Sequence, residues 1–424
     1  MSLVGCVYGD SAPPFRGGAR QSGRETTEIA VIGAGLTGLS AALHLAERGR
    51  GVMVLDRHAP GWGASGRNGG QVNPGLKPDP DAVARQVGGA RGAALVRAAW
   101  QAPDLVFDII ARHGIACDAV RGGTLRVARA ARDMEALRRL TGQCHAHGIE
   151  SAGLLDRDIT ASRVGSDRYR GALFDRRGGQ LNPLAYARGL AHAAIEAGAR
   201  IMIDSPALSL TRTVAGWRIG TPDGTVEAGQ VLLASNGYSD ALLPALPRSI
   251  VPVYSAIVAT APLPDPIRAS ILAGRESVYE LGRITTYYRI DAGGRLLIGG
   301  RSRSRDLSGP DSFRFLQNHA RRLWPQVASW RWTHGWNGQL AMTVDHLPHL
   351  HDPAPGLFAC LGYNGRGVAM ATLLGREMAR WIDGASEHEL PIPATPIRPM
   401  KLHRFWKLGV AWHVASGRAL DLIS

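Results

Sequence analysis

The sequence predicts an α/β fold, or α+β for the chain as a whole, from a pattern near its beginning. Residues 29–56 read as a β-branched strand, a glycine-rich turn, a helix and a second apolar strand. The turn has the spacing Gly33-x-Gly35-x-x-Gly38, and the second strand ends in Asp56. This order is that of a βαβ unit that binds a dinucleotide, so we expect a Rossmann-like domain.

Each position in this unit has a physical reason. Gly33 permits the tight turn out of the strand, and Gly38 allows the helix to pack closely against it. Gly35 lets a pyrophosphate approach the amides at the helix N-terminus, where the helix dipole favours negative charge. Asp56 is placed to accept hydrogen bonds from both ribose hydroxyls, which disfavours the 2′-phosphate of NADP. The unit alone does not distinguish FAD from NAD.

A second glycine-rich stretch, residues 61–71, follows directly. Its small residues allow a backbone to lie against a flat ring system, and Ser65, Arg67 and Asn68 offer hydrogen-bond donors to a cofactor. The stretch resembles the flavin-facing segment of FAD-dependent amine and amino-acid oxidoreductases, the D-amino-acid oxidase and glycine oxidase superfamily. Within it, the γ-glutamylputrescine oxidoreductase-like branch is the closest in appearance. The resemblance implies FAD as the cofactor.

The resemblance covers most of the chain. Residues 179–183 with the helix after them, residues 198–201 and the strand at 231–238 look like later segments of the family. The resemblance implies that Ala207 lies near the adenine and that residues 234–236 pass close to the cofactor.

A glycine-rich turn at 362–367 precedes a helix that we expect to run from about Val368 to Trp381. In the family, a comparable turn lies beside the pyrimidine edge of the flavin, where amides and a helix N-terminus stabilise negative charge. The full set of cofactor-binding residues predicted in this way is Gly33, Gly35, Leu36, Thr37, Gly38, Asp56, Arg57, Gly63, Ala64, Ser65, Arg67, Asn68, Gly69, Gly70, Gln71, Ala207, Ala234, Ser235, Asn236, Gly362, Tyr363, Asn364, Gly365, Arg366 and Gly367.

Three departures from the family pattern modify these expectations. No cysteine lies between Gln339 and Asp345, where the sarcosine oxidase branch attaches its flavin, so we expect noncovalent FAD. Leu297 stands where oxidases of that branch carry a lysine that helps oxygen accept electrons. The electron acceptor can therefore be oxygen or another molecule. Ala369 and residues 70–73 lack the cations that hold a small amino acid, which favours an amine such as an acylated polyamine or an amino-acid derivative.

Tyr287, Trp336 and Arg366 are the candidates for the substrate side. Tyr287 belongs to a predicted hairpin over residues 284–298, in a second domain built on a mainly antiparallel sheet. Trp336 is interpreted either as an aromatic wall for an amine or as core packing. Arg366 either holds a carboxylate of the substrate or pairs with a structural acid.

The chain is expected to divide into two interleaved domains with an extension at each end. The predicted parts are an extended N-terminal arm at 1–25, an FAD-binding domain at 26–80, 149–240 and 336–388, a helical insertion at 81–148 with a substrate domain at 241–335, and a C-terminal amphipathic extension at 389–424. In that extension Leu402, Phe405, Leu408 and Trp412 share one face, which docks on protein or lies on a membrane surface.

Composition limits the partners. The net charge of +14 is spread along the chain without an aromatic-interleaved basic groove, so we expect no nucleic acid partner. Four cysteines without zinc or disulfide spacing predict no metal site, and no set of carboxylates and cysteines with ligand spacing accompanies His346, His349 and His351. The sequence contains no run of about eighteen apolar residues, so we expect no transmembrane segment. We expect a cytoplasmic protein. The oligomeric state is not predicted.

These expectations combine into a functional hypothesis. A hydride passes from the carbon bearing a neutral amine to N5 of FAD, and the resulting imine hydrolyses to a carbonyl product. The scheme requires no side chain as a proton acceptor. The alternatives are an NAD-using dehydrogenase and a noncatalytic flavin-binding or membrane-surface interaction protein.

Overall fold

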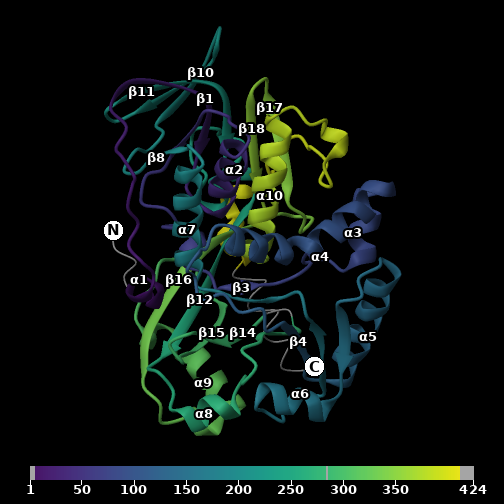
Figure 1. Cartoon of the computed structure of the whole chain (residues 1–424). Helices are drawn as coiled ribbons and strands as arrows, with labels where there is room; N and C mark the ends of the chain where they lie inside the picture. The colour runs from purple at the N-terminus through teal and green to yellow at the C-terminus, as the bar shows by residue number, and fades with distance from the viewer. Residues whose placement is uncertain (1–4, 283–284, 411–424) are drawn as a thin grey trace.

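Two large β-sheets lie at opposite ends of the molecule, with helices packed between and around them (Figure 1). The computed structural model describes residues 5–282 and 285–410. One sheet is mainly parallel and the other mainly antiparallel. This arrangement confirms the predicted α/β fold with its second, antiparallel part.

The first sheet is built on parallel strands. Its order is β17 (His349–Ala354), β18 (Leu357–Leu361), β11 (Gly224–Leu233), β1 (Gly23–Ile32), β2 (Val52–Leu55) and β8 (Arg200–Met202). Neighbouring strands in this order are parallel except for β17 with β18. The antiparallel strands β9 (Ser209–Thr213) and β10 (Gly216–Thr221) extend it beside β11.

Burial on both faces explains why the parallel strands read as continuous apolar runs. Ile29 and Val31 of β1 belong to one hydrophobic cluster, whereas Ala30 and Ile32 belong to another on the opposite face. Residues on a strand alternate between faces, so a strand that is covered on both sides has no polar positions.

Three helices support the first sheet near its glycine-rich turns. They are α2 (Leu36–Ala46), α7 (Pro183–Glu196) and α10 (Gly367–Ile382), and α4 (Gly89–Arg112) packs against α10 (Figure 1). Every residue of α2 is buried. The start of α7 is encoded locally, because the Asn182 side chain accepts a hydrogen bond from the Ala185 N–H and Pro183 follows as the first helical residue.

The second sheet is antiparallel except where β13 pairs with β4. Its order is β16 (Trp332–Met342), β12 (Val251–Thr260), β15 (Leu296–Arg301), β14 (Tyr287–Ile290), β13 (Ser277–Glu280), β4 (Thr124–Ala128), β6 (Gly171–Asp175) and β5 (Ala152–Leu155). The predicted hairpin is confirmed as β14 and β15.

Shorter elements complete the fold. The remaining helices are α1 (Val7–Ser11), α3 (Pro80–Val87), α5 (Ala131–Ala146), α6 (Arg157–Val164), α8 (Asp265–Ser270) and α9 (Arg314–Leu323), and β3 (Gln71–Val72) pairs with β7 (Gly179–Gln180). Short 3₁₀ helices are η1 (Ala64–Gly66), η2 (Asn236–Tyr238), η3 (Pro247–Ser249), η4 (Pro310–Phe313), η5 (Pro325–Val327), η6 (Glu387–Glu389) and η7 (His403–Phe405).

The strands divide between the sheets differently from the predicted domain boundaries. β5 and β6 lie within residues 149–240 but pair in the second sheet. β4 interrupts the segment 81–148 that we expected to be helical. The expected boundary at residue 336 falls inside β16. Periodicity identifies a strand but not its partner, because pairing depends on tertiary contacts.

The N-terminal stretch is not an extended arm throughout. Helix α1 lies in it, and Cys6, Val7 and Tyr8 are buried. The Tyr8 ring packs edge-on against Trp336, with ring centroids 5.4 Å apart. Apolar contact with β16 therefore orders a segment whose composition suggested a loop.

The apolar residues predicted to share one face of the C-terminal extension are largely exposed. Leu402, Phe405 and Leu408 are exposed, and Trp412 lies outside the described residues. A polar contact holds this part of the extension, because His403 Nε2 hydrogen-bonds to the Ile250 carbonyl at 2.9 Å.

Candidate cofactor and substrate site

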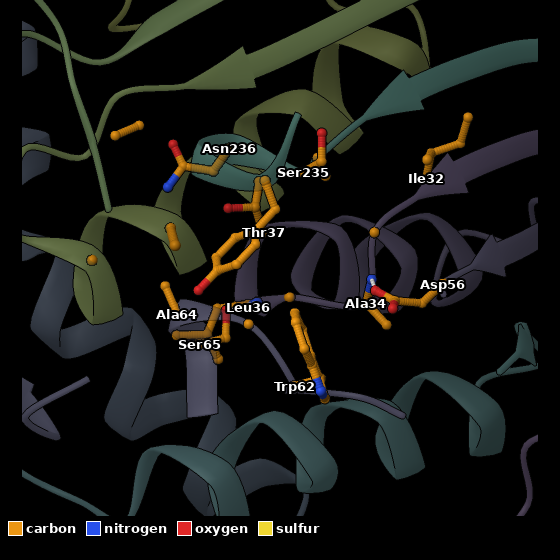
Figure 2. A pocket seen from close by; sticks show the side chains of 18 of the residues that line it. Ile32, Ala34, Leu36, Thr37, Asp56, Trp62, Ala64, Ser65, Ser235 and Asn236 are labelled. Carbon is orange, nitrogen blue, oxygen red and sulfur yellow. Dashed lines mark hydrogen bonds between the residues drawn. The ribbon is translucent and has the colours of Figure 1, made fainter. Parts of the chain in front are cut away.

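A cavity of about 300 Å³ lies at the carboxyl ends of the parallel strands β1 and β2. Figure 2 shows Thr37, Asp56, Trp62 and Ser65 arranged around it from different segments of the chain. The predicted cofactor residues that line it are Gly33, Gly35, Leu36, Thr37, Asp56, Arg57, Gly63, Ala64, Ser65, Asn68, Ala207, Ala234, Ser235, Asn236, Tyr363, Asn364, Gly365 and Gly367.

The N-terminus of α2 opens into this cavity. Gly33 has φ +115°, which favours glycine, and Gly35 is the N-cap without a side-chain cap. A Cβ on Gly35 would lie 2.9 Å from Ser65 Oγ, which accepts a hydrogen bond from the Leu36 N–H at 3.0 Å. The cavity therefore meets a helix end with amide groups that favour an anion such as a pyrophosphate.

Asp56 is held rigidly at the end of β2. Its Oδ2 accepts a hydrogen bond from the Ala34 N–H at 2.6 Å, and its Oδ1 accepts one from the His58 N–H at 2.7 Å. Burial raises the pKa of Asp56 above its usual value, while these two backbone donors oppose that shift. Each carboxylate oxygen keeps acceptor capacity for a ligand hydroxyl.

The turn at 362–367 is anchored by side chains that sequence analysis assigned to the cofactor. Asn236 Oδ1 accepts a hydrogen bond from the Gly362 N–H at 3.0 Å, and Asn364 Oδ1 accepts one from the Thr343 N–H at 2.9 Å. Both asparagines have positive φ, a conformation that asparagine adopts more readily than most residues. Their side chains shape the turn that carries the N-terminus of α10 to the cavity.

The residues present fit a dinucleotide. The N-termini of α2 and α10 both border the cavity, and the glycine positions leave room for a group to approach their backbone. The Trp62 Nε1 atom is buried without a hydrogen-bond partner, although its side chain lines the cavity. A buried unpaired donor is costly, so a bound ligand with acceptor atoms would complete the site.

A second, larger cavity of about 890 Å³ adjoins the first. The residues that line both cavities are Ala64, Asn68, Leu340, Asn364, Gly365 and Gly367. The second sheet supplies its far wall, including Tyr254, Ser255 and Tyr287. A cofactor that fills the first cavity would therefore present its end to a substrate in the second.

The three substrate-side candidates are placed differently. Tyr287 and Arg366 line the second cavity. The Tyr287 hydroxyl is 2.8 Å from Ser255 Oγ, and Gly69 and Gly299 leave the space that its ring occupies. Trp336 is 2 % exposed and lines neither cavity; its Nε1 donates to the Arg67 carbonyl at 2.9 Å. Trp336 is therefore a core-packing residue, and its hydrogen bond to Arg67 supports the loop at 61–71.

Several predicted donors are used within the protein. Asn68 donates to the Ser65 carbonyl at 2.7 Å and accepts from the Gly70 N–H at 2.8 Å. Arg67 donates to the Trp62 carbonyl, and Gln71 donates to the Val278 carbonyl. These contacts satisfy loop backbone groups, so the Asn68 amide and one Arg67 nitrogen already have partners within the protein, and a contact of either side chain with a cofactor stays a prediction.

The other predicted residues outside the first cavity have structural positions. A Cβ on Gly38 would overlap the Gly33 carbonyl, and one on Gly70 would overlap the Leu181 carbonyl. Gly69, Arg67, Gln71 and Arg366 line the second cavity, and Gly38, Gly70 and Gly362 line neither. Arg57 forms an ion pair with Asp240 at 3.1 Å across the rim of the first cavity.

Arg289 was not among the predicted site residues, and it is 3 % exposed. Its guanidinium donates to the Gly69 carbonyl at 2.6 Å, to Gln180 Oε1 at 2.8 Å and to the Tyr8 hydroxyl at 3.0 Å. Arg289 therefore joins the loop at 61–71 to β7 and α1. Its only signal in the sequence is a charged residue in an otherwise apolar strand.

The C-terminal extension also contributes to the second cavity, which sequence analysis did not foresee. Met400, Leu402, His403 and Trp406 line it together with the turn residue Arg366. The extension therefore forms part of the wall around the space for a substrate.

A family model described as FAD dependent oxidoreductase (DAO) matches residues 28–381. The chain belongs to the FAD-dependent oxidoreductase family. FAD is the cofactor of this family, so the predicted cofactor is confirmed and the NAD alternative is set aside.

Similar proteins support the predicted superfamily resemblance. A probable oxidoreductase, OrdL, of Haemophilus influenzae is 34% identical over 86% of this chain and 84% of its own length. The gamma-glutamylputrescine oxidoreductase of Escherichia coli is 31% identical over 85% of each chain. The glycine oxidase structure from Geobacillus kaustophilus superimposes with a TM-score of 0.72 at 23% identity, covering 89% of this chain and 99% of that one.

Within residues 5–282 and 285–410, His, Cys, Asp and Glu side chains form no group of three or more that could hold a metal ion. In the same part of the chain, no helix has the length and apolar character needed to span a bilayer.

We expect Asp56→Asn to weaken FAD binding by about 10- to 100-fold, because an amide offers only one acceptor to the two backbone N–H groups that Asp56 satisfies. The FAD content of the purified variant and the dissociation constant of its apoprotein measure this effect. Asp204→Asn is the matched control, since Asp204 is exposed and lines neither cavity. Unchanged affinity in Asp56→Asn would contradict the assigned role.

Proposed function

We propose that this FAD-dependent oxidoreductase oxidises the carbon–nitrogen bond of a primary or secondary amine. The carbon that bears the nitrogen loses a hydride equivalent and the nitrogen loses a proton, with FAD as the two-electron acceptor, and water hydrolyses the resulting imine to a carbonyl compound and ammonia or a smaller amine. The observation that carries the proposal is the second cavity, which meets the FAD cavity at six shared residues. The relative named gamma-glutamylputrescine oxidoreductase supports amine chemistry.

Bound FAD supplies the two-electron acceptor that amino-acid side chains lack. The residues that would hold it are those of the first cavity, with Asp56 at one end and the turn at 362–367 at the other. The four cysteines are buried, and none lines either cavity, which supports noncovalent binding.

The protein's own contribution is to hold the amine in its neutral form. Lys77, Arg301 and Arg366 line the second cavity, and their positive charges lower the pKa of an amine bound there. The neutral amine has a free electron pair that assists loss of a hydride from the neighbouring carbon. Tyr254 and Tyr287 limit the space in which the amine moves.

Tyr287 is not assigned as a base. Burial raises the pKa of Tyr287 to about 12, with the Ser255 hydrogen bond opposing the shift. The phenol therefore stays protonated throughout the pH range in which amines lose their proton. Its role is to present a fixed ring and hydroxyl to the cavity.

An anaerobic amine panel tests the proposal. The purified protein is expected to show flavin absorption, and a substrate amine should bleach it without added reductant. Admission of air then separates an oxidase, whose colour returns, from a dehydrogenase, whose colour stays low until another acceptor is added. A yellow protein that no primary or secondary amine bleaches would contradict amine oxidation and would favour a noncatalytic flavin-binding protein.

We expect Tyr287→Phe to lower kcat by less than about 10-fold, because loss of a general base costs about 100- to 10,000-fold. In both proteins kcat/KM should rise with pH as the substrate amine becomes neutral, and the midpoint should not move on substitution. Stopped-flow measurement of flavin reduction across pH checks this. A Tyr287→Phe variant that loses the rising limb would show that Tyr287 takes the proton.

A further inference from the structure

Arg289 is a buried cation whose hydrogen-bond partners are all neutral. The residue is 3 % exposed, and its guanidinium donates to the Gly69 carbonyl, to Gln180 Oε1 and to the Tyr8 hydroxyl. Within residues 5–282 and 285–410, it forms no ion pair with an Asp or Glu side chain. Burying an ion without a counter-ion is costly, so a charge kept in such a place is a candidate for a functional role.

Charged side chains near Arg289 do not neutralise it. Asp291 is paired with Arg295, because its Oδ1 accepts the Arg295 N–H at 2.8 Å and its Oδ2 lies 3.6 Å from Arg295 Nη1. Arg275 adds a second positive charge to the region. Burial lowers the pKa of Arg275 and repulsion from Arg289 lowers it further, while Asp118 and Asp291 oppose the shift. The surroundings of Arg289 are therefore short of negative charge.

Tyr8 and Gln180 fix the guanidinium without compensating its charge. Both residues are buried, at 1 % and 0 % exposure. Burial raises the pKa of Tyr8, although the positive charge of Arg289 opposes this shift, so the phenol stays neutral. Gln180 Nε2 donates to the Arg275 carbonyl, which turns its Oε1 toward Arg289. Arg289 thus keeps a full positive charge in one fixed position.

A chain of hydrogen bonds leads from Arg289 to the junction of the two cavities. Arg289 Nε donates to the Gly69 carbonyl at 2.6 Å, and the N–H of the same peptide group, that of Gly70, donates to Asn68 Oδ1 at 2.8 Å. Asn68 Nδ2 donates in turn to the Ser65 carbonyl at 2.7 Å, and Asn68 lines both cavities. Hydrogen bonds in such a chain polarise one another, so the charge of Arg289 acts at the point where the cavities meet.

Gly70 allows the guanidinium to approach the loop at 61–71 closely. This glycine has φ +68°, and a Cβ on it would lie 2.6 Å from Arg289 Nη2. The loop backbone therefore lies directly against the charge. In a buried region of low dielectric, a charge acts over a longer range than it does in water.

We propose that Arg289 raises the reduction potential of the bound FAD, because its buried positive charge stabilises the negative charge that a flavin gains when it takes up two electrons. Arg289 is a positioning residue in this assignment, since it acts through the loop at 61–71. The inference rests on the proposed function, which places the redox-active end of FAD at the junction of the two cavities. The alternative is a purely structural role, in which Arg289 only links the loop to β7 and α1.

Reductive titration of the FAD-loaded protein, with a reference dye of known potential, tests the charge. At one solution potential, we expect Arg289→Met to lower the ratio of reduced to oxidised FAD by about 10-fold. Arg289→Lys keeps the charge and loses part of the hydrogen bonding, so its ratio should stay close to that of the wild type. An equal fall in both variants would show that the hydrogen bonds and not the charge matter, which would overturn the proposal.

Gln180→Glu tests the charge with Arg289 still in place. A carboxylate there keeps the acceptor for Arg289 and cancels its charge, so we expect the ratio of reduced to oxidised FAD to fall by about 10-fold. A purely structural role predicts no fall, because the link to Arg289 becomes stronger. This variant also decides the question if Arg289→Met binds too little FAD for titration.

Gln317→Glu is the matched control for a carboxylate in place of a buried glutamine. Gln317 is 6 % exposed, donates to the Pro310 carbonyl at 2.8 Å and lines neither cavity. Its titration should match that of the wild type. An unchanged potential in Gln180→Glu, or an equal fall in Gln317→Glu, would overturn the proposal.

The titration uses a chemical reductant and no amine, so its result is separate from the proposed function. A lower potential in Gln180→Glu, in a protein that no amine bleaches, would support the role of Arg289 and refute amine oxidation. Bleaching by an amine, with equal potentials in the wild type and Gln180→Glu, would refute the role of Arg289 alone.

Discussion

The close contact between α2 and α10 is the constraint on which the cofactor site depends. Gly375 makes it possible, because a Cβ there would lie 2.5 Å from the Thr37 carbonyl and 2.6 Å from Ser40 Cβ. Ser40 Oγ donates to the Thr372 carbonyl at 2.8 Å, and the Thr37 and Tyr363 hydroxyls are hydrogen-bonded to each other. Two helices far apart in the sequence thus bring their N-termini to one cavity.

The two sheets contribute to different cavities. The parallel sheet supplies helix ends, glycine positions and the fixed carboxylate of Asp56, which together suit a dinucleotide. The antiparallel sheet and the C-terminal extension enclose a cavity that is cationic and partly aromatic. The loop at 61–71 contributes to both cavities. Arg289 and Trp336 fix this loop by hydrogen bonds to its Gly69 and Arg67 carbonyls. Substrate selection thus depends on the part of the molecule that the glycine motifs do not describe.

The sequence predicted β1, β2, α2, α10 and much of the lining of the first cavity, because these features rest on local spacing from Gly33 to Asp56 and on the glycine-rich turn at 362–367. The sequence could not predict which side-chain hydrogen-bond donors pair with other groups of the protein. Asn68 and Arg67 serve loop backbone groups whose positions follow from tertiary packing. Nor could it place Arg289, since three distant segments supply its partners. The pairing of β4, β5 and β6 in the second sheet could not be predicted either, because it depends on tertiary contacts and not on a local signal.

We propose that one FAD molecule spans the first cavity and ends at the turn of residues 362–367. The most direct measurement compares the dissociation constants of FAD and ADP for the apoprotein of the wild type and of Gly365→Val. Gly365 has φ +89° and lines both cavities. FAD binding should weaken by at least about 10-fold while ADP binding stays unchanged. Equal changes for both ligands, or no change for FAD, would contradict the account.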